Sequence, residues 1–252
     1  MMVHMGKPTP NLSGMPRGGP DACWLDRLLE TDRPEYLDRP DVDADVKRSV
    51  VRALDRAGEL FREHDRNTAL VLSEVAEVAD PAILELGAGH GGLSRKLLEQ
   101  HPTATVTVSD INADSVSAIA ASDLGQHPRA VVRTIDATDI DMPDGTFDLA
   151  VFALSFHHLP PESAAQVLAE GTRVAKKLVI IDLARPPAPL HLIRVATMAP
   201  LAPIWPFAHD GMISSLRSYS QSALQALGAH VGVRVEVRSL WPDRQMTVAR
   251  RP

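Results

Sequence analysis

The chain has 252 residues, which is enough for one α/β domain of about 150 to 200 residues and an accessory segment. A hydrophobic content of 44% with 23% charged residues excludes disorder of the whole chain. The net charge of −6, without a clustered basic patch, argues against nucleic acid or an anionic membrane as a partner. Because Cys23 is the single cysteine and no apolar stretch could span a bilayer, we expect a cytoplasmic protein without membrane insertion.

The N-terminal part is expected to contain a tail and a helical cap. Residues 1–21 hold glycine, proline and methionine without a basic start and an apolar run, so they predict a disordered tail rather than a secretory signal. Residues 22–80 predict the helical cap, with a short helix in CWLDRLL and an irregular piece that is a candidate cover for an active site. Apolar residues then recur at helical spacing over 42–79, which favours two amphipathic helices, the second of which ends at Asp80-Pro81.

The stretch ILELGAGHGGLS at residues 83–94 is the most informative part of the chain. It predicts a buried strand followed by a glycine turn that opens a helix. Gly87, Gly89 and Gly91 allow backbone conformations closed to other residues and a close approach to a ligand. Gly87, Gly89 and Gly92 also match the dinucleotide pattern G-x-G-x-x-G, so the glycines alone leave two cofactors open.

The charge around this turn favours one of the two cofactors. Glu85 precedes Gly87, and no Lys or Arg occurs between residues 83 and 94. Asp110 and Asp136 end the next two predicted strands, so three carboxylates are expected around one pocket. They would repel a pyrophosphate. S-adenosylmethionine carries a sulfonium, an ammonium and ribose hydroxyls but no phosphate, and it therefore fits better than a nicotinamide dinucleotide.

Strands and helices alternate beyond this turn, which predicts a parallel sheet with right-handed crossovers. The predicted strands lie at residues 83–86, 105–109, 131–135, 149–153 and 178–182, and the helices at 92–100, 113–122 and 162–175. Residues from about 185 to 219 form a proline-rich, apolar insertion. A helix at 220–227 and strands at 234–239 and 245–249 are expected to close the sheet with an antiparallel edge.

Four motifs, in the order in which they follow along the chain, resemble those of the class I S-adenosylmethionine-dependent methyltransferases: ELGAGHG, the strand end VSD, the IDA of the third strand and FDLAVFALSFHHLP. The resemblance runs from about Ala82 to Arg250. It implies a Rossmann-like, mostly parallel seven-stranded sheet in the order 3-2-1-4-5-7-6, with helices on both faces, in a methyltransferase domain at residues 81–252. Periodicity alone does not give this order.

The expected cofactor is S-adenosyl-L-methionine. Glu85 would steady the loop or face the methionine ammonium, Asp110 would accept the ribose hydroxyls, and Asp136 with the Ala137 amide would read the adenine. Each has a structural alternative: a polar strand end, a helix N-cap and a turn acid, respectively. The residues expected to bind the cofactor are Glu85, Gly87, Ala88, Gly89, Asp110, Ile111, Asp136, Ala137 and Ala153. His90 would contact the donor's carboxylate or point to solvent.

Two histidines are candidate catalytic residues. His157, preferred over His158 after the fourth strand, could remove a proton from a hydroxyl acceptor, or it could cap a helix or pack. His209, followed by Asp210, could line the acceptor site or belong to a surface loop. No metal is expected, because adjacent histidines point apart on a regular backbone and no third ligand stands at a recognisable spacing. The residues of the insertion expected to line or orient the acceptor are Met198, Trp205, Phe207, Met212, Arg217 and Tyr219.

These observations predict methylation of a small, largely hydrophobic acceptor in small-molecule biosynthesis. Oxygen of a phenolic or polyketide-like metabolite is the first choice of acceptor atom. HHLP and the short strands also resemble the quinone C-methyltransferases, so carbon stays open, as in quinone or lipid biosynthesis. The alternatives of another class are a nicotinamide-dependent oxidoreductase and a non-catalytic S-adenosylmethionine-binding module. The oligomeric state, monomer or homodimer, stays open.

Overall fold

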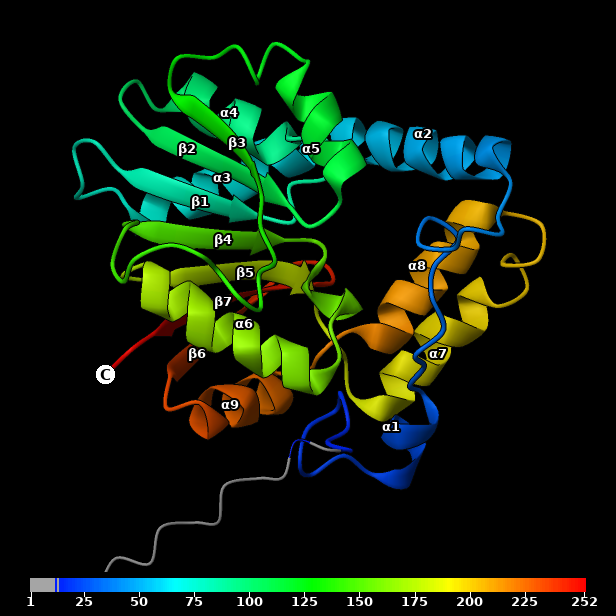
Figure 1. Ribbon diagram of the computed structural model, residues 1–252. Coiled ribbons are helices and arrows are strands. Elements are labelled where there is room, and N and C mark those ends of the chain that lie inside the picture. The colour runs from blue at the N-terminus through cyan, green and yellow to red at the C-terminus, as the bar shows by residue number, and fades with distance from the viewer. Residues whose placement is uncertain (1–11, 13) are drawn as a thin grey trace, which may run out of the picture.

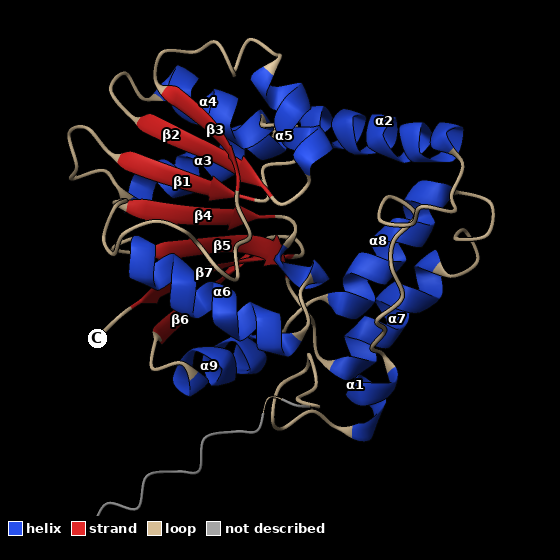
Figure 2. Cartoon of the chain, in the orientation of Figure 1, coloured by secondary structure: helices blue, strands red, loops and turns tan. Residues whose placement is uncertain are grey.

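The computed structural model describes residue 12 and residues 14–252, which fold into a sheet with helices on both faces (Figures 1 and 2). In this described part seven strands follow the order β3-β2-β1-β4-β5-β7-β6. Neighbouring strands from β3 to β5 pair in parallel, whereas β7 pairs antiparallel with β5 and β6. The expected fold is therefore confirmed. The strands are β1 (Ala82–Leu86), β2 (Thr105–Asp110), β3 (Ala130–Thr134), β4 (Leu149–Ala153), β5 (Leu178–Leu183), β6 (Arg234–Leu240) and β7 (Arg244–Arg250).

Two apolar cores lie on opposite faces of the sheet. Successive side chains of a strand point to opposite faces, so Ile83 joins one core while Leu84 and Leu86 join the other. Helices α6 (Pro161–Val174) and α9 (Gln221–His230) cover one face, as Figure 1 shows. Helices α3 (Glu63–Glu74), α4 (Gly92–Gln100) and α5 (Ala113–Ala120) supply the other core. The central strands are buried on both faces, which explains their continuous apolar sequences.

The carboxyl ends of the parallel strands meet at one edge of the sheet. A second group of helices lies beyond this edge in Figure 1, formed by α1 (Trp24–Leu28), α7 (Ala188–Met198) and α8 (Pro206–Arg217). Helix α2 (Ala44–Leu60) contacts α8, and it connects this group to α3 behind the sheet. The predicted insertion is therefore largely helical. Pro189 and Pro206 stand in the first turns of α7 and α8, where proline's missing N–H has no helical partner to lose.

The N-terminal segment differs from the expected tail. Residues 1–11 and 13 lie outside the described part of the chain, but Leu12 and Met15 are buried in a core of the sheet. Arg17 is 3% exposed, and its backbone carbonyl accepts a hydrogen bond from the Ser220 amide at 2.9 Å. The glycine- and proline-rich sequence of the N-terminal segment gives no periodic signal. The prediction of disorder therefore missed this packing, which depends on a distant loop.

Within the described residues, none of the helices combines the length and the apolar character needed to cross a bilayer.

Candidate active site

The turn after β1 has the backbone geometry that its glycines predict. Gly87, Gly89 and Gly91 have φ angles of +63°, +57° and +73°, in the left-handed region that favours glycine. A methyl group added at Gly87 would lie 2.5 Å from the Phe152 ring, whereas one added at Gly89 would meet no atom within 4 Å. The first glycine is therefore required by packing, and the second exposes bare backbone to open space.

Asp110 at the end of β2 holds this turn in place. Its Oδ2 accepts the Gly89 amide at 2.9 Å, and its Oδ1 accepts the Asn112 amide at 2.9 Å. The side chain of Asn112 caps α5 by accepting the Asp114 amide at 2.8 Å, so Asp110 itself is not the N-cap. A carboxylate offers about four acceptor sites, and two bonds leave Asp110 able to accept further donors from a ligand.

Glu85 lies under the same turn and is 3% exposed. The Ser94 hydroxyl at the start of α4 donates a hydrogen bond to its Oε2. Burial raises the pKa of Glu85 to about 7. The hydrogen bond from Ser94 opposes this rise, and the negative charge of Asp110 adds to it. This carboxyl group is thus poised to change charge near neutral pH beneath the turn.

The raised pKa of Glu85 predicts a pH-dependent stability. The folded state holds the Glu85 proton up to about pH 7 and the unfolded state only to about 4.5, so this stabilisation is complete below pH 4.5 and lost as pH rises through 7. We expect a loss of up to about 3 kcal/mol in the free energy of unfolding. Glu85→Gln should remove this pH dependence of the unfolding free energy, as measured by urea unfolding between pH 5 and 8. Exposed Glu99→Gln is the control, and an unchanged pH slope in Glu85→Gln would contradict the assignment.

The other residues expected to bind the cofactor lie along the same edge. The Ala88 amide bonds the Ser109 carbonyl at 2.8 Å, which ties the turn to β2. Ile111 follows β2 and is 66% exposed. Asp136 is exposed after β3, and its Oδ1 accepts the Thr138 amide at 2.8 Å, as its turn alternative predicts. Ala137 and Ala153 are half-buried, and His90 is exposed. The strand order brings the Glu85, Asp110 and Asp136 strand ends into adjacent positions.

A short 3₁₀ helix, η1 (Phe156–His158), follows β4 and is anchored on several sides. Leu154, just before it, has a φ of +62°, a strained conformation for a residue with a side chain. Arg17 donates to the His157 carbonyl at 2.9 Å, and Arg217 donates to the His158 carbonyl at 2.5 Å. The Tyr219 hydroxyl donates to the next carbonyl, of Leu159, at 2.8 Å. Arg217 and Tyr219, expected to orient the acceptor, therefore hold the backbone of η1.

The His157 ring lies between two carboxylates. Its Nδ1 is 2.8 Å from Asp182 Oδ1, and its Nε2 is 3.4 Å from Glu35 Oε1. Burial by itself lowers the pKa of His157, but the charges of Asp182 and Glu35 outweigh it and raise the pKa to about 9. In return, the imidazole holds the pKa of the Asp182 carboxyl below its usual range despite burial. A pKa above neutrality favours the protonated imidazole, which suits donating a hydrogen bond better than removing a proton.

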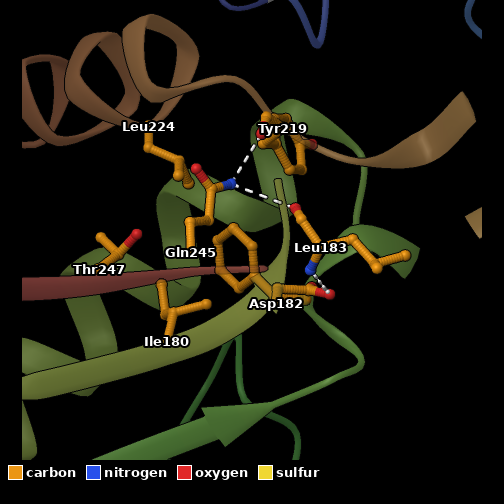
Figure 3. Close-up of a pocket in the computed structure, with 8 residues that line it drawn as sticks. Ile180, Asp182, Leu183, Tyr219, Leu224, Gln245 and Thr247 are labelled. Atoms are coloured by element: carbon orange, nitrogen blue, oxygen red, sulfur yellow. Dashed lines mark hydrogen bonds between the residues drawn. The ribbon is translucent and has the colours of Figure 1, made fainter. Parts of the chain in front are cut away.

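Asp182 is fixed by the end of β5. The carboxylate accepts the backbone amides of Leu183 at 2.7 Å and of His157 at 2.8 Å. Figure 3 shows Asp182 beside a small cavity in which the Gln245 amide donates to the carbonyls of Tyr219 and Leu183. The cavity volume of about 10 Å³ suits a single water at most, so it is not the acceptor site. The hydrogen bonds of Gln245 around this cavity hold the strand end that orients His157.

The second imidazole of the pair, His158, lies against the segment between α1 and α2. Its Nδ1 is 3.1 Å from Asp38 Oδ2, and its Nε2 is 3.9 Å from Glu35 Oε2. The ring centres of His157 and His158 are 4.4 Å apart. The expectation that adjacent histidines point apart is therefore wrong here, because it assumed a regular backbone and η1 turns both rings toward one side.

His209 lies in α8 rather than in a surface loop. Its Nδ1 is 2.8 Å from Asp210 Oδ1, and its ring stacks on Tyr36 with centroids 3.8 Å apart. The Tyr36 amide donates to the same Asp210 oxygen at 2.8 Å, and Ser214, one turn along α8, donates to Glu35 Oε1 at 2.5 Å. The insertion and the N-terminal segment thus pack together. His209 contacts Tyr36, while His157 and His158 contact the preceding residue, Glu35.

Sequence reasoning missed Glu35, Asp38 and the orienting role of Asp182. The available signal was weak: a polar segment, RPEYLDRP, bounded by prolines and already suspected of covering a site. Of the residues expected to line the acceptor site, Phe207, Met198 and Met212 are half-buried and Trp205 is exposed. The rings of Trp205 and Phe207 lie 5.3 Å apart.

The turn after β1 fits S-adenosylmethionine. Bare backbone at Gly89, the free acceptor capacity of Asp110 and the carboxylate of Glu85 suit a ligand with a positive charge and hydroxyl groups. The guanidinium of Arg95, which lies beside the turn, is engaged by Asp123 and by the His90 carbonyl, so it offers no ready partner for a pyrophosphate. The same residues are therefore a poor match for a dinucleotide.

Comparison with known proteins identifies the type of domain. A family model described as a methyltransferase domain matches residues 83–177. The malonyl-[acyl-carrier protein] O-methyltransferase of Geobacter sulfurreducens is 36% identical over 100 residues, covering 39% of this chain and 36% of that protein. The chain spans between 36% and 56% of the length of the curated relatives it matches.

Solved structures share the fold. The plantazolicin methyltransferase BamL, solved with a triazolic desmethylPZN analog and SAH, has a TM-score of 0.62 at 13% identity, over 85% of this chain and 92% of that one. The [4+2]-cyclase SpnF has a TM-score of 0.57 at 16% identity, over 75% and 80% of the two chains. At such low identities these likenesses show the fold alone.

Proposed function

We propose, from the premise that this chain belongs to the class I S-adenosylmethionine-dependent methyltransferases, that it methylates an oxygen of a small, largely apolar acceptor. The proposal is carried by two imidazole–carboxylate pairs: His157–Asp182 at the carboxyl edge of the sheet that carries the cofactor turn, and His209–Asp210 in α8, which lies beyond that edge in Figure 1. When bound, S-adenosylmethionine supplies a methyl group activated by a positively charged sulfur.

The residues of the turn would hold this cofactor. Gly87 and Gly89 shape the backbone against it, Glu85 and Asp110 offer carboxylates, and Asp136 with Ala137 lies next along the edge. Ala88, Ile111 and Ala153 complete the surroundings of these strand ends. Together they would orient the cofactor and exclude water from it, which is the main way such transfer gains rate.

The acceptor would lie between the sheet edge and α7–α8. Met198, Phe207 and Met212 from this insertion offer half-buried apolar surface. Polar contacts come from His209 of the same insertion and from Glu35, His157 and His158. An apolar wall with a few converging polar groups is typical of a small-molecule site. The Geobacter relative is named an O-methyltransferase, which supports oxygen over carbon as the acceptor atom.

Of the two candidate histidines, we assign proton removal to His209. Its Nδ1 faces the Asp210 carboxylate, so the ring is oriented with its Nε2 free, as in other acid–base pairs. His157 already carries a proton between Asp182 and Glu35, so it suits binding the acceptor oxygen better than deprotonating it. Both residues therefore stay in the proposed catalytic set, with different tasks.

The proposed function is tested by incubating the full chain with isotope-labelled S-adenosylmethionine and a fractionated cell extract. Mass spectrometry should reveal a labelled product heavier than its precursor by one methylene, and fragmentation should place the label on oxygen. Asp110→Ala is the matched control, since it should lose product together with cofactor binding. Cofactor binding without any labelled product would instead favour a non-catalytic binding module, and label on carbon would overturn the choice of acceptor atom.

A further inference from the structure

The side chains of Glu35, His157 and His158 converge on one point. The carboxylate of Glu35 and one ring nitrogen each of His157 and His158 all lie within 4.8 Å of one another. Two of the residues come from η1, and Glu35 comes from the segment between α1 and α2. Because η1 is held by Arg17, Arg217 and Asp182, the two imidazoles are positioned before any ligand arrives.

Each imidazole has its outer nitrogen engaged by a further carboxylate. Asp182 lies 2.8 Å from Nδ1 of His157, and Asp38 lies 3.1 Å from Nδ1 of His158. A carboxylate accepts the Nδ1 proton, which directs Nε2 of each ring to the inner side. Histidines that bind metals are commonly oriented by a carboxylate in this way.

The inner nitrogen of His157 lacks a hydrogen-bond partner. The His157 side chain is 6% exposed, and its Nε2 is buried without a hydrogen bond although Glu35 Oε1 is 3.4 Å away. Ser214 donates to that same Glu35 oxygen, so one oxygen is oriented from behind. A buried nitrogen that makes no hydrogen bond is costly. A cation bound between this nitrogen, the Glu35 carboxylate and the second imidazole would take the place of the proton that His157 otherwise carries.

We propose that Glu35, His157 and His158 bind one divalent first-row transition-metal ion. Ligands at about 2.1 Å from a metal stand about 3 to 3.5 Å from one another. The distance of 3.4 Å between His157 Nε2 and Glu35 Oε1 lies in this range, whereas the distance of 3.9 Å between His158 Nε2 and Glu35 Oε2 exceeds it. Binding therefore requires the side chains of Glu35 and His158 to move closer together. Two imidazoles with one carboxylate favour zinc, cobalt, nickel or iron over magnesium or calcium.

Such a site would leave coordination positions open for an oxygen ligand. Use of the ion, in place of the His157 proton, to hold the acceptor hydroxyl rests on the proposed function, whereas binding of the ion does not. Metal binding is therefore measured without cofactor or acceptor, and its failure leaves the methyl-transfer proposal intact.

The test uses the full chain without a histidine tag, freed of metal by chelation and titrated with Co²⁺. Calorimetry and the visible absorption of Co²⁺ should show one ion per chain, and the ion should raise the thermal unfolding temperature. Glu35→Gln and His158→Gln should each weaken binding by at least about tenfold, and Asp38→Asn by about tenfold. His64→Gln removes an exposed imidazole on α3 and should bind as the unmodified chain does.

Two results would overturn the site. One is the absence of stoichiometric Co²⁺ binding to the unmodified, folded chain, which would leave His157 as a cation between two carboxylates. The other is unchanged affinity in both Glu35→Gln and His158→Gln. His158 is half-buried, so its variant remains informative if the loss of buried Glu35 prevents folding.

Discussion

Replacement of His209 by alanine is expected to lower kcat by about 10²- to 10⁴-fold, because a positioned general base contributes on that order. The affinity for S-adenosylmethionine should not change, since His209 lies in α8 and the cofactor turn follows β1. Steady-state kinetics with the acceptor found in the extract experiment, together with calorimetry of the cofactor, measure the two effects separately.

The control for this experiment is His64→Ala, which removes an exposed histidine from α3. Asp210→Asn tests the orienting carboxylate, and it should lower kcat while leaving the imidazole in place. If His209→Ala retains near-normal kcat, then stacking on Tyr36 is the role of this histidine and the assignment of the base is wrong.

Alanine at Gly89 is expected to separate the cost of backbone strain from the loss of cofactor contact. Gly89 and Gly145 have φ angles of +57° and +65°, and an added methyl group at either meets no atom within 4 Å. Both variants should therefore lose about 1 to 2 kcal/mol of unfolding free energy, the cost of a left-handed conformation with a Cβ. Only Gly89→Ala should also weaken cofactor binding, by on the order of 100-fold, because its methyl group would occupy the ligand's space.

The matched pair makes this result interpretable. Gly145 lies before the amino end of β4, at the edge of the sheet opposite the cofactor turn. Gly87→Ala is a poor substitute, since its methyl group would collide with Phe152 and Ser155 and unfold the local packing. Equal cofactor affinities for Gly89→Ala and Gly145→Ala would show that the ligand does not lie against this backbone.

The backbone geometry of the cofactor turn could be predicted from the sequence because its determinants are local. Gly87, Gly89 and Gly91 follow a buried strand directly, and a left-handed turn at that position requires residues without a side chain. Asp110 could be placed because parallel strands end at a common edge, and the structure confirms its approach to the turn through the Gly89 amide. The full strand order needed the family resemblance, since alternation alone does not rank the strands.

The acceptor half depended on tertiary structure. Glu35 and Asp38 lie in an irregular segment without periodicity, and only the folding of this segment against η1 and α8 brings them to His157, His158 and Ser214. The same long-range packing places Arg17 under η1 in a region whose composition predicts disorder. By itself, then, the sequence determined the glycine turn and its acidic strand ends. Tertiary structure decided the charge and partners of each histidine, because burial and approaching carboxylates come from elements distant in the chain.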